Sequence, residues 1–110
     1  MKTGLVIEDN ENNMVLITRL LEKSGYRTLS AATGMQGVEV ALREKPDFII
    51  LDIQLPDVDG TEVLIKIRSS EIGYTIPVIA MTSFAMSGDR ERLLAAGCDE
   101  FSVGGEDSAV

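Results

Sequence analysis

A chain of 110 residues with 18 acidic and 10 basic side chains has a formal net charge of -8 and a size typical of one domain. The negative charge argues against direct binding to nucleic acid or to an anionic membrane surface, and it favours cations and basic protein surfaces as partners. The chain lacks histidine, which excludes imidazole-based catalytic triads and histidine-ligated metal sites.

The cysteine content and the lack of targeting segments indicate where the protein is located. The single cysteine, Cys98, excludes an internal disulfide and is expected to be a small apolar core residue. No stretch resembles a signal peptide or an apolar span of about 20 residues. We therefore expect a soluble cytoplasmic protein.

The first half of the chain alternates strand and helix patterns. Leu5 to Ile7 is a continuous apolar run, typical of a strand buried on both faces, and Arg27 to Ala31 is a weaker strand candidate. Apolar residues recur at helical spacing before Gly25, a residue suited to a helix C-terminus, and again before Pro46. The apolar positions of these two helices are Met14, Ile17, Leu20, Leu21, Met35, Val38, Ala41 and Leu42.

The second half repeats this alternation. Phe48 to Leu51 and Val78 to Met81 are continuous apolar runs, and Glu100 to Val103 is a weaker strand candidate. The two predicted helices contain Val63, Leu64 and Ile67, and Arg90 to Ala96 before Gly97. Strands that alternate with helices predict a parallel sheet with right-handed crossovers and helices on both faces.

Polar residues follow three of the predicted strands. Glu8 and Asp9 follow the first strand, Asp52 the third, and Thr82 and Ser83 the fourth. In a parallel α/β sheet the carboxyl ends of the strands lie along one edge, where ligands bind. We therefore expect three carboxylates and two hydroxyls in one pocket.

Three neighbouring carboxylates raise one another's pKa unless a cation is present. Mg²⁺ prefers oxygen ligands and commonly uses one or two carboxylates together with phosphate oxygens. A carboxylate in such a site can act as a nucleophile towards phosphorus and form an aspartyl-phosphate. Asp52 is the best placed for this role, because it ends a central strand and a loop follows it. A hydroxyl from Thr82 is expected to hydrogen-bond a phosphoryl oxygen.

Four segments, LVIEDN, DFIILDIQLPDVDG, IPVIAMTSFAM and AAGCDEF, resemble in order and spacing the receiver domain of two-component response regulators. The resemblance covers roughly residues 3 to 103. It implies a flavodoxin-like, doubly wound sheet of five parallel strands in the order 2-1-3-4-5. We accordingly assign residues 1–103 to a receiver domain and residues 104–110 to an atypical tail.

The resemblance also implies a function. Asp52 would accept a phosphoryl group from a sensor histidine kinase or a histidine phosphotransfer protein, and the domain would switch its surface for a downstream protein target rather than act as an enzyme. Thr82 would be the switch hydroxyl and Phe101 the switch aromatic. The implied Mg²⁺ ligands are Asp9, Asp52 and the backbone carbonyl of Gln54, with Glu8 acting through water.

The end of the chain departs from the family pattern. Gly104 stands where the family has a lysine, and residues 104–110 are too short and too glycine-rich to form the family's fifth helix. Without that helix, apolar surface around Leu5, Ile7 and the strand from Phe101 to Val103 is expected to be open, which predicts a weak homodimer. The missing lysine favours, as an alternative function, an interaction module that does not switch.

Several residues have simpler interpretations. Glu8 and Asp9 are also suited to capping a helix that starts near Asn12, and Met14, Met35, Met81 and Met86 are expected to fill the core. The run Asp57-Val58-Asp59-Gly60-Thr61 resembles the signature of haloacid-dehalogenase phosphatases, which also use an aspartyl nucleophile. That signature requires its first Asp at a strand end, whereas the apolar strand here ends at Asp52. Asp57 and Asp59 are therefore predicted to be turn and helix-start residues.

Overall fold

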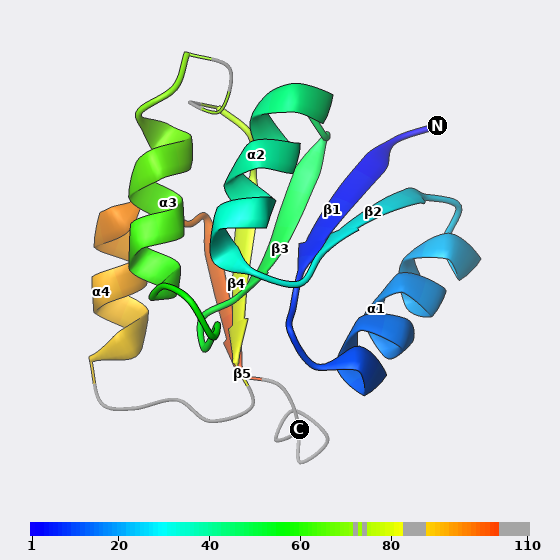
Figure 1. Cartoon of the computed structure of the whole chain (residues 1–110), viewed down its shortest axis with the longest axis horizontal. Helices are drawn as coiled ribbons and strands as arrows, with labels where there is room; N and C mark the ends of the chain where they lie inside the picture. The colour runs from blue at the N-terminus through cyan, green and yellow to red at the C-terminus, as the bar shows by residue number, and fades with distance from the viewer. Residues whose placement is uncertain (72, 74, 83–87, 104–110) are drawn as a thin grey trace.

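The computed structural model describes residues 1–71, 73, 75–82 and 88–103. Five parallel strands form one sheet in the order β2-β1-β3-β4-β5 (Figure 1), which confirms the predicted fold and strand order. The strands are β1 (Thr3–Ile7), β2 (Arg27–Ala31), β3 (Phe48–Asp52), β4 (Val78–Thr82) and β5 (Glu100–Val103). The helices that alternate with them are α1 (Glu11–Lys23), α2 (Gly34–Glu44), α3 (Gly60–Arg68) and α4 (Asp89–Ala96).

The main hydrophobic core lies between the sheet and three of the helices. It combines apolar side chains from β1, β3 and β4 with residues of α2, α3 and α4. Leu5, Ile49, Leu51, Leu64 and Leu93 are completely buried there. Full burial of a leucine or isoleucine side chain stabilises the fold by about 1.5–3 kcal/mol, so this core fixes the strands and hence the edge where they end.

Helix α1 packs differently, on the side of the sheet away from α2 and α3 (Figure 1). It contributes no residue to the main core and has no fully buried side chain. Met14, Ile17 and Leu21 of its predicted apolar stripe are half-buried, whereas Leu20 is 58% exposed. The prediction of a helix is confirmed, although Leu20 of its apolar stripe faces solvent.

The expectation that the surface around Leu5 and Ile7 is open needs correction. Leu5 and Ile7 are not open surface, because both are 0% exposed and α2 approaches so closely that a Cβ at Gly37 would lie 2.4 Å from Ile7 Cδ1. Phe101 is half-buried against the same core. The predicted weak homodimer therefore does not follow from these residues and stays a prediction.

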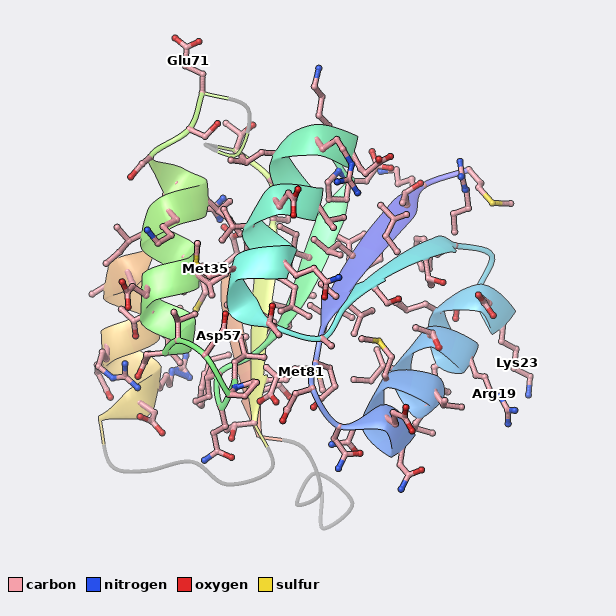
Figure 2. The ribbon with its side chains drawn as sticks, in the orientation of Figure 1. Arg19, Lys23, Met35, Asp57, Glu71 and Met81 are labelled. Carbon is pink, nitrogen blue, oxygen red and sulfur yellow. The ribbon has the colours of Figure 1, made fainter. Side chains whose placement is uncertain are left out.

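The methionines are less buried than expected. Met35, in the first turn of α2 and labelled in Figure 2, is 46% exposed, which contradicts its assignment to the core. Met14 and Met81 are half-buried, while Met86 lies outside the described residues. Cys98 is 6% exposed and belongs to the core cluster, as expected.

No helix in the described parts of the chain combines the length and the apolar character needed to cross a membrane. Gly104 and the tail of residues 104–110 lie outside the described residues. The expectations about the missing lysine and the missing fifth helix are therefore not addressed by the structure.

Candidate functional site

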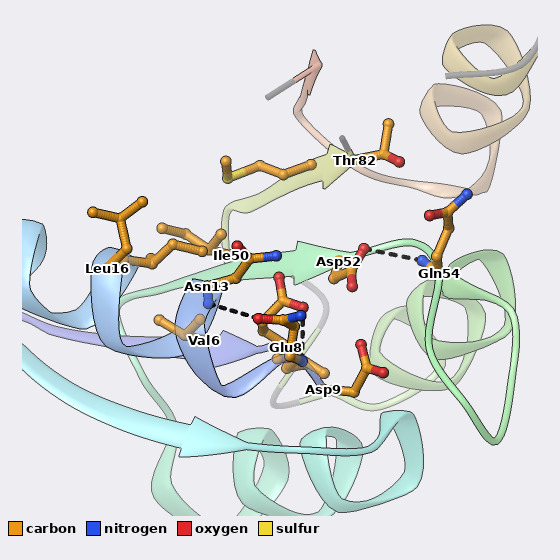
Figure 3. Close-up of a pocket in the computed structure, with 13 residues that line it drawn as sticks. Val6, Glu8, Asp9, Asn13, Leu16, Ile50, Asp52, Gln54 and Thr82 are labelled. Atoms are coloured by element: carbon orange, nitrogen blue, oxygen red, sulfur yellow. Dashed lines mark hydrogen bonds between the residues drawn. The ribbon is translucent and has the colours of Figure 1, made fainter. Parts of the chain in front are cut away.

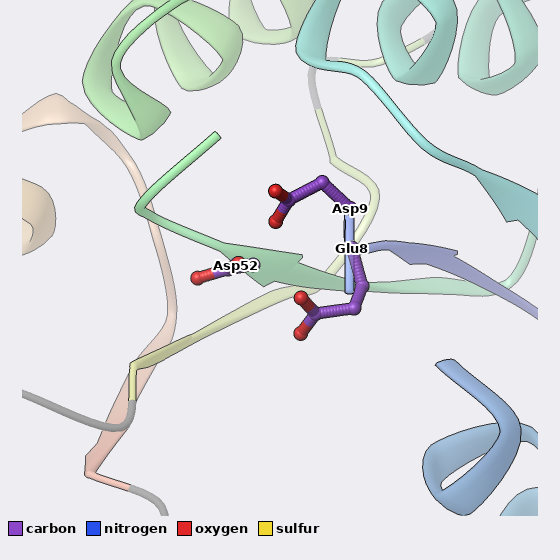
Figure 4. Close-up of side chains that lie close together, drawn as sticks. All are labelled: Glu8, Asp9 and Asp52. Atoms are coloured by element: carbon purple, nitrogen blue, oxygen red, sulfur yellow. The ribbon is translucent and has the colours of Figure 1, made fainter. Parts of the chain in front are cut away.

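The carboxylates of Glu8, Asp9 and Asp52 gather at the carboxyl ends of β1 and β3 (Figure 4). Each residue has a carboxylate oxygen within 4.8 Å of an oxygen from the other two. The strand register explains the cluster: Ile7 pairs with Leu51, so the residues that follow them, Glu8 and Asp52, emerge side by side. The predicted convergence of the three acids is therefore present in the fold.

Backbone groups hold two of these carboxylates in place. The N–H of Asn10 donates to a Glu8 carboxylate oxygen at 3.1 Å, and the N–H of Gln54 donates to Asp52 Oδ1 at 3.1 Å (Figure 3). The chain thus folds back on both acids directly after each strand. Donation of this kind favours the ionised form of a carboxyl group.

The start of α1 corrects one interpretation of Glu8 and Asp9. The helix N-cap is Asn10, whose side-chain oxygen accepts from the N–H of Asn13 at 2.9 Å. Glu8 instead accepts from Asn10 itself. The capping requirement of α1 is met by an asparagine, which leaves the carboxylates of Glu8 and Asp9 directed at the cluster (Figure 4).

Asp52 is electrostatically unusual. Partial burial, together with the negative charges of Glu8 and Asp9, raises its pKa from 3.8 to about 7, against the opposing effect of the Gln54 N–H. Burial is the largest of these causes. The ionised form of such a carboxylate is destabilised by burial and by repulsion from its neighbours. A bound cation would offset both effects.

The acids lie at one end of a cavity of about 530 Å³ between α1 and the sheet. Thr82 of β4 is 3% exposed and lines the cavity with Asp52 and Gln54, as Figure 3 shows. The rest of the cavity is mainly apolar. Its apolar lining residues are Val6, Ile7, Leu16, Ile17, Ile50 and Met81.

The remaining candidate residues lie elsewhere. Phe101 on β5 pairs with Ala80 of β4 and packs on the core, so it is not among the residues that line the cavity. Ser83 lies outside the described residues. The structure thus brings Thr82, but not Phe101, next to the acidic cluster.

The carboxylates of Asp57 and Asp59 accept hydrogen bonds from backbone N–H groups at the N-termini of two helices. Asp59 is the N-cap of α3 and accepts from the N–H of Thr61 at 2.7 Å, as predicted. Asp57 reaches a different helix: its two carboxylate oxygens accept from the first N–H groups of α2, Gly34 at 2.8 Å and Met35 at 2.9 Å. The Met35 and Gly34 N–H groups also lower the pKa of Asp57.

Sequence reasoning missed two contributors to the site. Asn10 and Gln54 position Glu8 and Asp52 through their backbone N–H groups, and a backbone donor carries no signature of its own in the sequence. An asparagine before a helical pattern is a recognised capping signal, and this signal could have identified Asn10 as the N-cap in place of Glu8 and Asp9.

The donor set suits a hard divalent cation. The three carboxylates offer only oxygen atoms, which Mg²⁺ prefers, and the cluster contains no sulfur or imidazole ligand. Burial and the neighbouring charges of Glu8 and Asp9 raise the pKa of Asp52, and a bound cation would favour its ionised form. Glu8, Asp9 and Asp52 therefore fit a magnesium site.

Comparison with known proteins gives consistent results across sequence and structure. The model of the response regulator receiver domain family matches residues 5–103. The polar-differentiation response regulator DivK of Brucella ovis is 44% identical over 100 residues, which cover 91% of this chain and 81% of that protein. The residues matched by the family model include Glu8, Asp9 and Asp52, the whole acidic cluster.

Solved structures agree on the fold. The receiver domain of a sensor histidine kinase from Pseudomonas aeruginosa PAO1, solved with a magnesium ion coordinated in its active-site cleft, has a TM-score of 0.87 at 38% identity. The superposition covers 94% of this chain and 85% of that one. The chemotaxis protein CheY4 of Vibrio cholerae has a TM-score of 0.89, 22% identity, and coverage of 96% and 88%, which shows a likeness of fold alone.

Proposed function

Because the chain belongs to the response regulator receiver domain family, we propose that it accepts a phosphoryl group on Asp52 and changes its surface in response. The observation that carries this proposal is the position of Asp52, which ends the central strand β3 within 4.8 Å of the Glu8 and Asp9 carboxylates and has an elevated pKa. Perturbed carboxyl groups that line a cavity are typical of reactive sites.

The proposed chemistry is the transfer of a phosphoryl group from a phosphohistidine. An Asp52 carboxylate oxygen attacks phosphorus, a new O–P bond forms, and the N–P bond of the donor breaks as the imidazole leaves. The Gln54 N–H, 3.1 Å from Asp52 Oδ1, holds the carboxylate in orientation. Thr82, which lines the same cavity, offers a hydroxyl to a phosphoryl oxygen.

A divalent cation would be held by Glu8, Asp9 and Asp52, together with the backbone carbonyl of Gln54. When bound, Mg²⁺ would neutralise the charge of the carboxylates and of the incoming phosphoryl oxygens. The related receiver domain from Pseudomonas aeruginosa contains magnesium in its cleft, which supports the same ion here. Glu8 would act through a water molecule and Gln54 through its backbone carbonyl.

The proposed switch connects Thr82 with Phe101. Thr82 would move towards the phosphoryl group, and Phe101, on the neighbouring strand and half-buried, would change position with it. Such a change is a population shift between two states, driven by the added charge. The alternative of a module that does not switch rests on Gly104, which replaces the family's lysine.

Membership of the family supports a proposal for the phosphoryl donor and the target. We infer a sensor histidine kinase or a histidine phosphotransfer protein as donor and a downstream protein as target, in keeping with the negative charge of the chain and its preference for basic surfaces. The domain would act once per phosphoryl group received, as a signalling acceptor in the cytoplasm rather than as an enzyme with an external substrate.

Acetyl phosphate or beryllofluoride with Mg²⁺ tests the proposal. Intact mass should show one added phosphoryl group after acetyl phosphate, and amide NMR should show changes at Asp52, Gln54 and Thr82 after beryllofluoride. Asp52→Asn should abolish both responses, whereas Asp57→Asn and Asp59→Asn should retain them. Uptake that persists in Asp52→Asn but is lost in Asp57→Asn would contradict the assignment and favour a phosphatase-like nucleophile.

The same experiment distinguishes a receiver domain that switches from an interaction module that does not. A domain that switches should show chemical-shift changes at Phe101 as well as at Asp52. Phosphoryl uptake with no change at Phe101 would instead support the module that does not switch.

A further inference from the structure

Helix α4 depends on polar contacts for its position. Leu93 is its only fully buried apolar side chain, so the helix gains little from apolar burial. Two arginines join it to α3, one near each end. Arg92 lies on α4 itself, and Arg68 is the last residue of α3.

The C-terminal end of α4 is firmly held by Arg68. Its Nε donates to the carbonyl of Gly97, the C-cap of α4, at 3.0 Å, and its guanidinium also contacts Asp99 at 3.0 Å. The same side chain donates to the carbonyls of Gly73 at 2.8 Å and Ile76 at 2.7 Å. The Arg68 side chain is 18% exposed, and buried, well-satisfied hydrogen bonds of this kind are costly to break.

The N-terminal end is held by a more exposed contact. One terminal nitrogen of Arg92 lies 3.0 Å from Asp59 Oδ1 and also contacts Thr61 Oγ1, while the other lies 3.0 Å from Asp89 Oδ1. The side chains of Arg92 and Asp59 are 43% and 55% exposed. The Asp89 side chain is only 11% exposed. Exposed ion pairs are weak and are screened by salt, so the Arg92–Asp59 pair is easier to break than the contacts of Arg68.

The Arg92 contact leads back to the acidic site. Asp59, which binds Arg92, forms an isolated antiparallel bridge with Gln54. Gln54 in turn donates its N–H to Asp52. A continuous series of contacts therefore runs from Asp52 through Gln54 and Asp59 to Arg92 on α4, and it passes along the loop after β3 rather than through Thr82 and Phe101.

We propose that Arg92 is a positioning residue that couples a chemical change at the Asp52 side chain, such as substitution or modification, to the N-terminal end of α4 through this loop. Such a change alters the bond of Asp52 with the Gln54 N–H, which shifts the loop and the Asp59 carboxylate. Arg92 moves with the Asp59 carboxylate to which it is paired, while Arg68 keeps the C-terminal end of α4 in place. The proposal rests on the proposed function for the natural event that alters Asp52, but the coupling itself requires only a change at that residue.

The test uses Asp52→Asn as a perturbation that needs no ligand. In the wild-type background this substitution should shift the amide NMR signals of α4, measured at Leu93 and Leu94. In the Arg92→Gln background the shift should fall below about half of the wild-type value, because contacting residues couple and separated ones do not. Arg92→Lys, which retains the charge, should restore part of the response.

Two controls make the test specific. Arg90→Gln removes the same charge from the same helix, and Arg90 makes no ion pair within the part of the chain that the structure describes, so it should leave the response intact. Asp59→Asn retains an oxygen for capping α3 but loses the ion pair, so it should behave like Arg92→Gln. High salt should reduce the wild-type response and leave that of Arg92→Gln unchanged.

The outcomes separate this proposal from the proposed function. A full α4 response in Arg92→Gln, or an equal loss in Arg90→Gln, overturns the coupling through Arg92. Beryllofluoride with Mg²⁺ forms the second arm, and in the wild type it should shift Leu93 and Leu94 together with Asp52. If Asp52 does not respond to beryllofluoride, the phosphoacceptor function is wrong, whereas the Asp52→Asn comparison still decides the coupling.

Discussion

Glu8 and Asp52 hold carboxylate oxygens within 4.8 Å of each other, at the ends of two strands that pair in parallel. The negative charge of Glu8, added to the larger effect of burial, helps to raise the pKa of Asp52 to about 7. The ionised form of Asp52 is thus less favourable in the folded chain than in the unfolded one. Stability and ion binding at this site should therefore both depend on its charge.

The first prediction concerns pH in the absence of divalent ions. The folded pKa of Asp52 lies above its ordinary value of 3.8, so its contribution to stability is fully present at low pH and is lost as pH rises towards about 7. Because Asp52 is partly exposed, solvent screening reduces the effect, and we expect a loss of about 1–2 kcal/mol. Urea unfolding of the wild type and Asp52→Asn across this pH range measures the difference.

A matched control isolates Asp52 from the other acids. Glu39→Gln removes an exposed carboxylate on α2 and should retain the wild-type pH dependence. If Asp52→Asn loses as much stability with rising pH as the wild type does, the elevated pKa of Asp52 is not the cause.

The second prediction concerns magnesium. Binding of a cation to the folded cluster stabilises the protein by mass action, so millimolar Mg²⁺ should raise the melting temperature at neutral pH. The increase should be smaller at pH about 5, where protons compete for Asp52. Asp52→Asn and Asp9→Asn should weaken the response, and Asp57→Asn should not. A melting temperature that is insensitive to Mg²⁺ in the wild type would refute the metal site.

The third prediction concerns Asp57, which binds the N-terminus of α2 with both carboxylate oxygens. Asp57→Asn leaves one oxygen acceptor, so the melting temperature should fall, although phosphoryl uptake at Asp52 should persist. Since its pKa is lowered by the Met35 and Gly34 N–H groups, the stabilising effect of Asp57 is present above its ordinary pKa and is lost as pH falls. The difference between wild type and variant should therefore shrink in acid, as thermal unfolding can measure.

Much of the fold and site could be predicted because it depends on local patterns. Continuous apolar runs marked the strands, and the rule that parallel strands end on one edge placed Glu8, Asp9 and Asp52 together before any contact was known. The positions of Asp52 and Thr82 at strand ends follow directly from these runs.

Other features depend on contacts between distant segments. Asp57 caps a helix that precedes it in the sequence, and Arg68 and Arg92 join α3 to α4, relations that no local spacing encodes. The burial of Leu5 and Ile7 depended on which sheet face α2 covers, whereas the exposure of Leu20 reflects the looser packing of α1. A periodic apolar pattern identifies a helix but does not determine how deeply each position is buried.

The last prediction concerns Arg68, which donates to the Gly97, Gly73 and Ile76 carbonyls and pairs with Asp99. Arg68→Ala would leave several partly buried acceptors without this donor, and we expect a loss of about 2–4 kcal/mol in the free energy of unfolding. Arg68→Lys keeps the charge but not the planar group that reaches several acceptors at once, so it should recover only part of that loss. Chemical denaturation measures both values.

Arg43→Ala provides the control for Arg68. Arg43 is 59% exposed and pairs with Glu39 and Glu44 on the surface of α2, so its removal should cost about 0–1 kcal/mol. If Arg68→Lys were as stable as the wild type, charge alone would hold Asp99, and the carbonyl contacts would contribute little. The contacts of Arg68 would then be no stronger than the exposed ion pair between Arg92 and Asp59.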